Sequence, residues 1–307
     1  MDTPHPIEVP THQPEKTEHR EHKKQPETFA LVPLTFVRSA MFKPCKLIKS
    51  EERPKERRKI AAEIGPLGID IDCDGPLLNQ EHFLAWQAAI YLGRIHAGMD
   101  GTKFVVHSNE LLRLMAKGYR DHDQRKLLWI LLSDLQATRV YLKSHRSRYV
   151  GNLLDALAKD DKTGVISIRL NPDLANLLAD ETLENDVFRM ASLGRDQIAM
   201  WLHNYFASWG KYRNVSVSDL HRMCGTNLDE RRFRYRLKQA LPKLKNCEGS
   251  YVTDIRLGND DIVYVTKTTT KVRLLKPEDK EKSGGNRLNA QHDAARKAAA
   301  ARAKVCH

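Results

Sequence analysis

Cysteine is scarce in this chain of 307 residues, and its placement follows no pattern. The five cysteines are scattered and odd in number, and no C-x-x-C pair occurs. Disulfide-bonded small domains and zinc fingers need paired or regularly spaced cysteines. Neither class of protein fits this sequence.

Long apolar runs are also missing. The opening residues, MDTPHPIEVP, contain no apolar signal core, and no run of about 18 apolar residues is found. Aromatic residues make up 7% of the chain, hydrophobic residues 41%, and the mean hydropathy is −0.56. We therefore expect a soluble protein of the bacterial cytoplasm with no membrane partner.

Signatures of catalysis are absent as well. The sequence has no G-x-x-x-x-G-K-[ST] loop for a nucleotide and no His-x-His pair of the kind that a DNA-nicking initiator uses. His107 and His122 are isolated, and the acidic cluster Asp70-Ile-Asp72 is typical of turns. We expect no enzymatic activity, no cofactor and no metal ion.

Positive charge is abundant. The chain has 51 Lys and Arg against 39 Asp and Glu, a net charge of +12 and a pI near 9.4. Each cation that meets a phosphate releases condensed counterions, so this excess favours a polyanionic partner. From composition we expect a disordered tail at 1–30, a basic arm or linker at 31–65 and a disordered basic tail at 271–307.

The middle of the chain contains an internal repeat. In each copy an amphipathic helix precedes a short strand, a short helix, a longer helix and a stretch of alternating apolar residues. Three helices followed by a hairpin, twice, predict an α+β, helix-rich fold of two tandem winged-helix domains, at 66–180 and 181–270. They would join near the acidic residues 179–186. The predicted elements are helices at 83–95, 108–115 and from Asp123, with strands at 104–107, 138–143, 149–157 and 165–170, and then helices at 197–209, 217–224 and 229–245, with strands at 215–217, 251–257 and 262–267.

The last of these helices, residues 229–245, has the composition of a DNA-recognition helix. At 100° per residue its apolar side chains share a stripe roughly 100° wide, and its other faces are almost entirely cationic. An Arg guanidinium can donate two hydrogen bonds to guanine O6 and N7, and both Arg and Lys form ion pairs with phosphate. A plain solvated helix has a similar pattern, but the position in the repeat favours DNA contact. The residues expected to contact DNA are Arg231, Arg232, Arg234, Tyr235 and Lys238.

One residue of this helix interrupts it. Pro242 falls on the outer face and removes a hydrogen bond to the carbonyl of Lys238, so we expect the helix to bend or end nearby.

The equivalent helix of the first copy is more apolar. Arg125 and Lys126 stand near its start as candidate DNA contacts, but residues 127–132 are apolar nearly all round. That pattern predicts burial on two sides, against the other domain or a second subunit, and leaves the DNA role of this helix open. Cations of its wing are the alternative phosphate contacts, namely Lys143, His145, Arg146 and Arg148.

Three stretches resemble the plasmid replication initiators of the TrfA type. The segment Leu34-Thr-Phe-Val-Arg-Ser-Ala-Met-Phe42 is similar to a short Arg-Ser-Ala-Leu-Phe segment of that family. Gly75-Pro-Leu-Leu-Asn-Gln-Glu-His-Phe-Leu-Ala-Trp86 resembles its entry into the first domain. The third stretch runs from His221-Arg-Met-Cys-Gly225 through the basic helix to Gly258-Asn-Asp-Asp-Ile-Val-Tyr264. The resemblance covers about residues 34–268.

This resemblance implies a protein that binds direct repeats, called iterons, at a plasmid origin. It also implies opening of an adjacent AT-rich segment, recruitment of the host helicase and initiator machinery, control of plasmid copy number, and a possible homodimer. Two alternatives stay open on the residues alone. One is a winged-helix transcriptional repressor of its own gene, and the other is a rolling-circle nickase.

Overall fold

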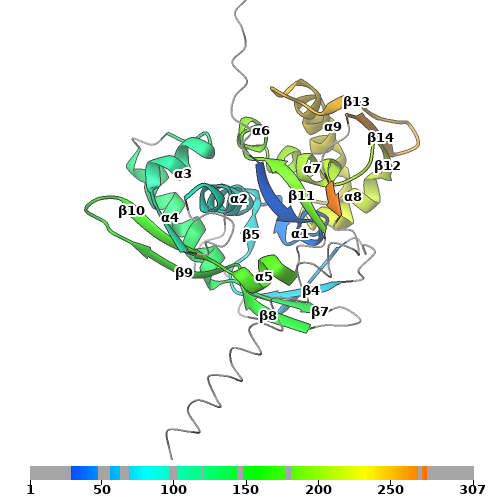
Figure 1. Ribbon diagram of the computed structural model, residues 1–307. Coiled ribbons are helices and arrows are strands. Elements are labelled where there is room, and N and C mark those ends of the chain that lie inside the picture. The colour runs from blue at the N-terminus through cyan, green and yellow to red at the C-terminus, as the bar shows by residue number, and fades with distance from the viewer. Residues whose placement is uncertain are drawn as a thin grey trace, which may run out of the picture.

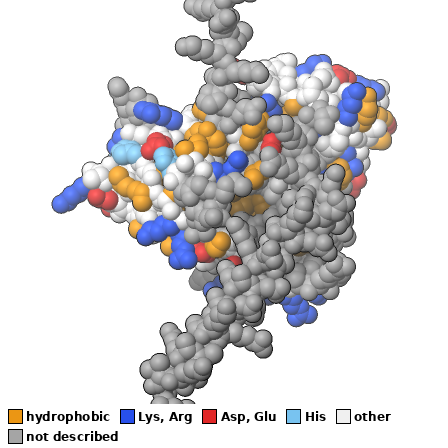
Figure 2. All heavy atoms as spheres, viewed as in Figure 1, with side chains coloured by type: hydrophobic (Ala, Val, Ile, Leu, Met, Phe, Trp, Pro, Cys, Tyr) orange, Lys and Arg blue, Asp and Glu red, His pale blue; other side chains and the backbone are white. Residues whose placement is uncertain are grey.

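The computed structural model describes residues 29–47, 56–62, 69–96, 103–118, 121–143, 148–177, 181–268 and 272–274 (Figure 1). It is a mixed α/β structure in which helices pack among several small sheets. On the parts of the face that Figure 2 shows in colour, charged side chains lie beside small patches of hydrophobic ones. The predicted tail residues 1–28 and 275–307, and Arg146, lie outside the described residues. Among the described helices, none has the length and hydropathy that a membrane span requires.

The first copy of the repeat folds into what we call the first unit. Its three strands form an antiparallel sheet in the order β6-β10-β9, with α2, α3 and α4 packed against one another beside it. The elements are α2 (Gln80–His96), β6 (Lys103–His107), α3 (Ser108–Leu114), α4 (His122–Ala137), β9 (Leu154–Lys159) and β10 (Val165–Leu170).

The second copy, the second unit, has the same order of elements and the same sheet connections. Its antiparallel sheet runs β12-β14-β13, so that in each unit the last strand lies between the other two. The repeat in the sequence is therefore a repeat in the structure. The elements are α7 (Gln197–Ala207), β12 (Tyr212–Ser216), α8 (Val217–Cys224), α9 (Glu230–Asn246), β13 (Val252–Leu257) and β14 (Ile262–Lys267).

A further sheet interrupts the first unit and corrects one prediction. The strand expected at 138–143 does not belong to the wing hairpin, because the structure pairs β7 with β4 and β8 in a four-stranded sheet, β3-β4-β7-β8. The strand expected at 149–157 is divided, with its first part in β8 of that sheet and its last part in β9. The wing of the first unit is the β9–β10 hairpin. The chain leaves one sheet at Leu153, between β8 and β9, and the apolar residues of 149–157 do not mark that point. The strands of this extra sheet are β3 (Arg58–Ile60), β4 (Asp70–Asp74), β7 (Arg139–Lys143) and β8 (Arg148–Asn152).

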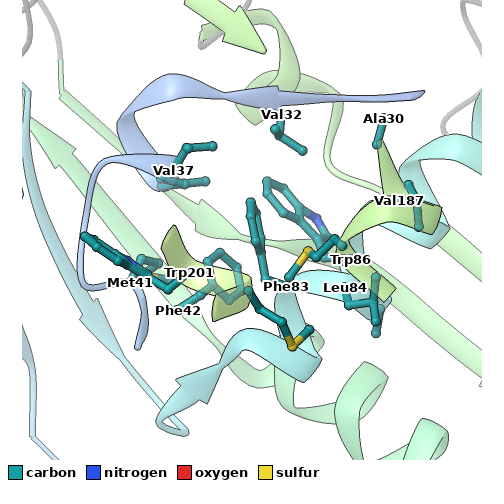
Figure 3. Close-up of a cluster of buried hydrophobic side chains, with 14 of the residues drawn as sticks. Ala30, Val32, Val37, Met41, Phe42, Phe83, Leu84, Trp86, Val187 and Trp201 are labelled. Atoms are coloured by element: carbon teal, nitrogen blue, oxygen red, sulfur yellow. The ribbon is translucent and has the colours of Figure 1, made fainter. Parts of the chain in front are cut away.

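The segment expected to be a basic arm is buried over its first part. Residues 29–43 form β1 (Phe29–Pro33), α1 (Leu34–Val37) and β2 (Phe42–Lys43), and β2 pairs with β5 (Leu78–Asn79). Phe42 lies 4.6 Å from Phe83, ring centre to ring centre, and Trp86 packs beside both (Figure 3). Burial of so many apolar groups outweighs the effect of the few nearby cations. The arm assignment is therefore wrong for residues 31–47.

The same N-terminal segment also reaches the second unit. The indole nitrogen of Trp201 donates to the Ser39 carbonyl at 3.2 Å, and the Arg38 guanidinium stacks 3.9 Å from the ring centre of Trp209. Gly225 ends α8 at φ +63, and a Cβ there would lie 2.6 Å from the Ala40 Cβ. Only glycine combines that backbone conformation with so close an approach.

The predicted join near 179–186 is a central strand. β11 (Glu181–Asp186) lies between β1 and β15 (Val272–Leu274) in an antiparallel sheet that gathers three distant segments of the chain. Leu183 is 0% exposed and Asn185 1%. The sequence does not predict this strand because most of its residues are polar, and because β15 lies in what was expected to be a disordered tail. Two short helices flank the strand, α5 (Pro172–Leu177) before it and α6 (Val187–Ser192) after it.

Helix ends follow local capping chemistry, with one shift. The Asp229 carboxylate accepts from the Arg232 backbone N–H at 2.8 Å and begins α9 as predicted. In α4 the cap is Asp121 rather than Asp123, which lies inside the first turn. Pro242 does not end its helix, because α9 continues to Asn246 with the exposed proline inside it.

Candidate nucleic-acid interface

The α9 helix is held by its apolar stripe. Phe233, Leu237 and Ala240 are each 0% exposed, and the helix packs against α7, α8 and β13. The ring of Phe233 lies 5.1 Å from the His221 ring, whose Nε2 is hydrogen-bonded to the Leu228 carbonyl oxygen. Full burial of each large apolar side chain contributes about 1.5–3 kcal/mol, so this stripe fixes which face of α9 points outward.

The outward face of α9 is cationic and open. Tyr235 is 62% exposed, and the arginines and lysines around it are exposed too. Within the described part of the chain, Arg231, Arg236 and Lys238 form no ion pair with a carboxylate. Lys and Arg side chains are visible at the upper right of Figure 2, over the α9–β13 region. These three cations are therefore available to an anion from outside.

Other cations on the same helix are tied to the protein. The Lys243 ammonium lies 2.6 Å from an Asp196 carboxylate oxygen, and Lys245 lies 3.2 Å from Asp254. Arg232 pairs with its own cap, Asp229, at 3.2 Å while its side chain stays 77% exposed. The open cations therefore lie in the first two-thirds of α9, and the last turn is anchored to neighbouring elements.

Arg234 is placed differently from the expectation. Its guanidinium forms an ion pair with Asp261 in the turn between β13 and β14, and its side chain is 32% exposed. The residue lies next to the apolar stripe, where a long side chain reaches the hairpin more easily than the open face. Arg234 therefore ties the start of α9 to the tip of the hairpin.

The tip of this hairpin is acidic rather than basic. The Tyr264 hydroxyl donates to an Asp260 carboxylate oxygen at 2.6 Å, which lowers the pKa of Asp260 and raises that of Tyr264. The Arg256 guanidinium lies 4.4 Å from the centre of the Tyr264 ring. Asp260 therefore accepts a hydrogen bond from Tyr264, and Asp261 forms an ion pair with Arg234. Because both carboxylates are engaged within the protein, they repel an approaching phosphate less strongly.

Sequence reasoning does not single out Arg236. This residue lies on the flank of the helix opposite Arg234, about 100° from Leu237 on a helical wheel. In the structure it is exposed and unpaired among the described residues, like Arg231. The sequence signal that could have identified Arg236 is that no acid lies four residues before or after it, where Arg232 and Ala240 stand. An acid at either position could have formed an ion pair with Arg236 along the helix.

The corresponding helix of the first unit offers fewer open cations. Lys126 is exposed and Arg125 half-buried, both in the first two turns of α4. Beyond them Leu128, Leu131 and Leu132 are buried, and the Lys159 ammonium of β9 lies 5.7 Å from the centre of the Trp129 ring. The apolar surface of α4 is thus covered largely by its own unit.

The cations expected on the first wing lie on the extra sheet. Lys143 and Arg148 are paired in register at the β7–β8 end and line a hollow of about 450 Å³ together with Arg57, Asp70 and Tyr141. Arg57 is already engaged, because its guanidinium donates to Asp72 at 2.6 Å and lies 3.8 Å from the Tyr141 ring centre. The structure does not bring these residues next to α4 as a wing.

The described residues contain no cluster of His, Cys, Asp and Glu arranged to hold a metal ion. Burial raises the pKa of the Cys224 thiol to about 12, so this cysteine is not a thiolate at neutral pH. The exposed side chains of α9 can bind an anion through ion pairs and hydrogen bonds.

No family model matches this chain, and no curated protein matches its sequence. Domains 2 and 3 of RctB, as the selenomethionine derivative, align with 72% of this chain and 94% of theirs, at 12% identity and a TM-score of 0.51. The chain has the fold of these two domains. At 12% identity the likeness concerns the fold alone.

Two further solved structures are less similar. A second crystal structure of RctB domains 2–3 covers 72% of this chain and 95% of that one, at 11% identity and a TM-score of 0.46. The Pi initiator protein in complex with iteron DNA covers 62% and 94%, at 12% identity and a TM-score of 0.46.

Proposed function

We propose that this chain is a plasmid replication initiator that binds iterons at its origin through two tandem winged helices. In this proposal α9 is the recognition helix of the second unit and enters the major groove, while the β13–β14 hairpin lies beside the backbone. The observation that carries the proposal is the outward face of α9, where Arg231, Arg236 and Lys238 surround Tyr235 without any acidic partner among the described residues.

Three independent features support this role. The repeated order of helices and strands gives two similar units, the arrangement expected of tandem winged helices. The fold resembles domains 2 and 3 of RctB over most of both chains. The sequence resembles initiators of the TrfA type in three stretches that span both units. We extend the proposal to an absence of catalytic activity, to opening of the origin and to recruitment of host helicase machinery.

A binding experiment with a matched control tests the role of α9. The DNA would be a duplex selected by the full-length chain from a randomised pool. Arg231→Ala with Lys238→Ala removes two open cations, and Lys243→Ala with Lys245→Ala removes two cations already paired with Asp196 and Asp254. We expect the first pair of changes to lower affinity about 30-fold or more and the second to change it less than about 3-fold.

Salt dependence gives a second readout of the same variants. If the two open cations meet phosphates, the slope of log affinity against log salt becomes smaller by about one for each phosphate that is no longer neutralised. Equal affinity of wild type and the Arg231/Lys238 variant for the selected duplex would overturn the assignment of α9.

Replication itself separates initiation from gene repression. A plasmid that carries the origin but lacks this gene should replicate only when the gene is supplied in trans. The Arg231/Lys238 variant should fail to support it, and the Lys243/Lys245 variant should succeed. Normal replication without the gene would leave repression as the function. A covalent protein–DNA adduct on supercoiled origin DNA would instead indicate a nickase.

A further inference from the structure

A seam of buried amide side chains joins the two units. Gln80 and Gln87 come from α2, Asn204 from α7, and Asn185 from β11, the strand between the units. Each of these four side chains is at most 1% exposed. Burial of a polar group this deep in the protein destabilises the fold unless the group makes its hydrogen bonds.

Asn185 bridges the two sides of the seam, and two direct hydrogen bonds between α2 and α7 lie beside it. The Asn185 amide nitrogen donates to Gln87 Oε1 at 2.8 Å and to Asn204 Oδ1 at 2.6 Å. Asn204 Nδ2 donates in turn to Gln80 Oε1 at 3.0 Å, and the Gln80 backbone N–H donates to Gln197 Oε1 at 3.0 Å. The two hydrogens of a single amide therefore hold α2 on one side and α7 on the other.

The two third helices pack on the two helices that the seam joins. The α2 helix packs against α4, and α7 packs against α9. A rotation of α2 relative to α7 would therefore move α4 relative to α9. Apolar contacts tolerate small sliding movements, but directional hydrogen bonds between buried amides do not, because each bond that breaks leaves an unpaired group costing about 1–3 kcal/mol.

We propose that Asn185 is a specificity-determining residue that fixes the spacing of the two DNA segments bound by the two units. The inference rests on the proposed function, since it requires both units to meet DNA. Asn185 does not touch DNA and acts as a positioning residue. By holding α2 and α7 in one orientation, it makes the protein accept one separation of its half-sites and reject others.

The test measures affinity as the separation changes. The full-length chain selects duplexes from a randomised pool, hydroxyl-radical footprinting locates the two contacted segments, and probes are then made with up to five base pairs inserted between them. Five base pairs are about half a helical turn. For the wild type we expect this insertion to weaken binding about 100-fold, because the two units no longer bind together.

The seam variant should respond differently. Asn185→Leu keeps the approximate volume of the side chain and removes both donated hydrogen bonds. We expect this variant to bind the original probe about 10-fold more weakly than the wild type does. The insertion should then lower the affinity of the variant by less than about 3-fold, since the units can turn relative to each other. Val265→Ala, a change in the core of the second unit where the side chain is 2% exposed, is the control for lost stability and should keep the full spacing preference.

A second variant keeps the test decisive if Asn185→Leu does not fold. Replacing Asn185, Gln87 and Asn204 together by Leu removes most donors and acceptors of the seam at once, which is less costly than leaving partners unpaired. This variant should fold and show the relaxed spacing preference. Retained spacing preference in a folded seam variant, or a wild type indifferent to insertion, would overturn the inference.

The outcome for the proposed function is separate. The Arg231/Lys238 variant should weaken binding by a similar factor at every spacing, whereas the seam variants change the ratio between spacings. Failure of one pattern therefore does not imply failure of the other.

Discussion

The two units share one topology and differ in what their third helices present. In the second unit α9 buries a narrow stripe and leaves Arg231, Arg236 and Lys238 open around Tyr235. In the first unit α4 is half-buried on several sides, and its cations stand in its first two turns. The arrangement of helices and strands is thus common to both units, whereas the residues on the outward face of the third helix decide whether that face is open and cationic.

The largest expected effect tests what the units have in common. Leu131 of α4 and Leu237 of α9 each lie on the buried face of the third helix of their unit and are each 0% exposed. Leu131→Ala and Leu237→Ala should each lower the free energy of unfolding by about 2–5 kcal/mol, because both leave a cavity in a packed core. Urea unfolding followed by circular dichroism measures the free energy of unfolding of each variant. A loss below about 1 kcal/mol for one of the two would show that the units are not packed alike.

The next largest effect tests how α9 and α4 differ in their expected contribution to DNA binding. Arg231→Ala with Lys238→Ala in α9 should cost about 2–4 kcal/mol of binding free energy on the selected duplex. Arg125→Ala with Lys126→Ala in α4 should cost about 1 kcal/mol or less, since contacts at the end of a mostly buried helix are limited to phosphates. Fluorescence anisotropy at fixed salt gives both values. A larger loss for the α4 pair would reverse the roles assigned to the two helices.

A third prediction concerns acid stability of the second unit. Burial, with the nearby charges of Arg189 and Lys267, lowers the pKa of His203 to about 3. Between the ordinary pKa of His, about 6.5, and this value, the unfolded chain binds a proton that the folded chain does not. The free energy of unfolding should therefore fall as the pH drops below about 6.5, by about 1.4 kcal/mol per pH unit from this group.

The control for this prediction is His203→Gln, which keeps a polar group of similar size and removes the titration. Chemical unfolding at pH 7, 6 and 5 should show a shallower decline for this variant than for the wild type. Parallel pH profiles of wild type and His203→Gln would contradict the prediction.

The smallest expected effect concerns the hairpin of the second unit. Arg234→Ala and Asp261→Ala should each weaken DNA binding by less than about 1 kcal/mol, and the double variant should be no weaker than either single variant, because they remove the same ion pair. The salt slope should stay unchanged. If Arg234→Ala alone made the slope smaller by about one, Arg234 would contact a phosphate, as the sequence predicted.

Local patterns predicted much of both units. The 3.6-residue period and capping residues located α8 and α9 to within a residue, and period-two alternation located β10, β13 and β14. They did not locate β11, which is mostly polar, or β15, which is three residues long, because both strands pair with partners far along the chain. Likewise, nothing near Leu153 in the sequence reveals that the chain passes there from one sheet to another.

The candidate site divides in the same way. The helical wheel placed Arg231, Tyr235 and Lys238 on the open face, because burial of the apolar stripe follows from helix geometry alone. It did not separate Arg234, paired with Asp261, from Arg236, which is open, because the two flank the stripe at similar angles. The difference comes from the hairpin that packs beside one flank and not the other.

By itself, the sequence determined the repeated pattern of helices and strands, the apolar stripe of α9 and the excess of positive charge, because each depends on neighbours within a few turns of the chain. The tertiary structure alone decided that residues 29–43 are core, that β1, β11 and β15 form one sheet, and that Asn185 bridges α2 and α7. Those features depend on contacts between separate elements of the chain, such as β1 with β11 and β11 with α2, and no local period or composition records which distant partner satisfies a buried polar group.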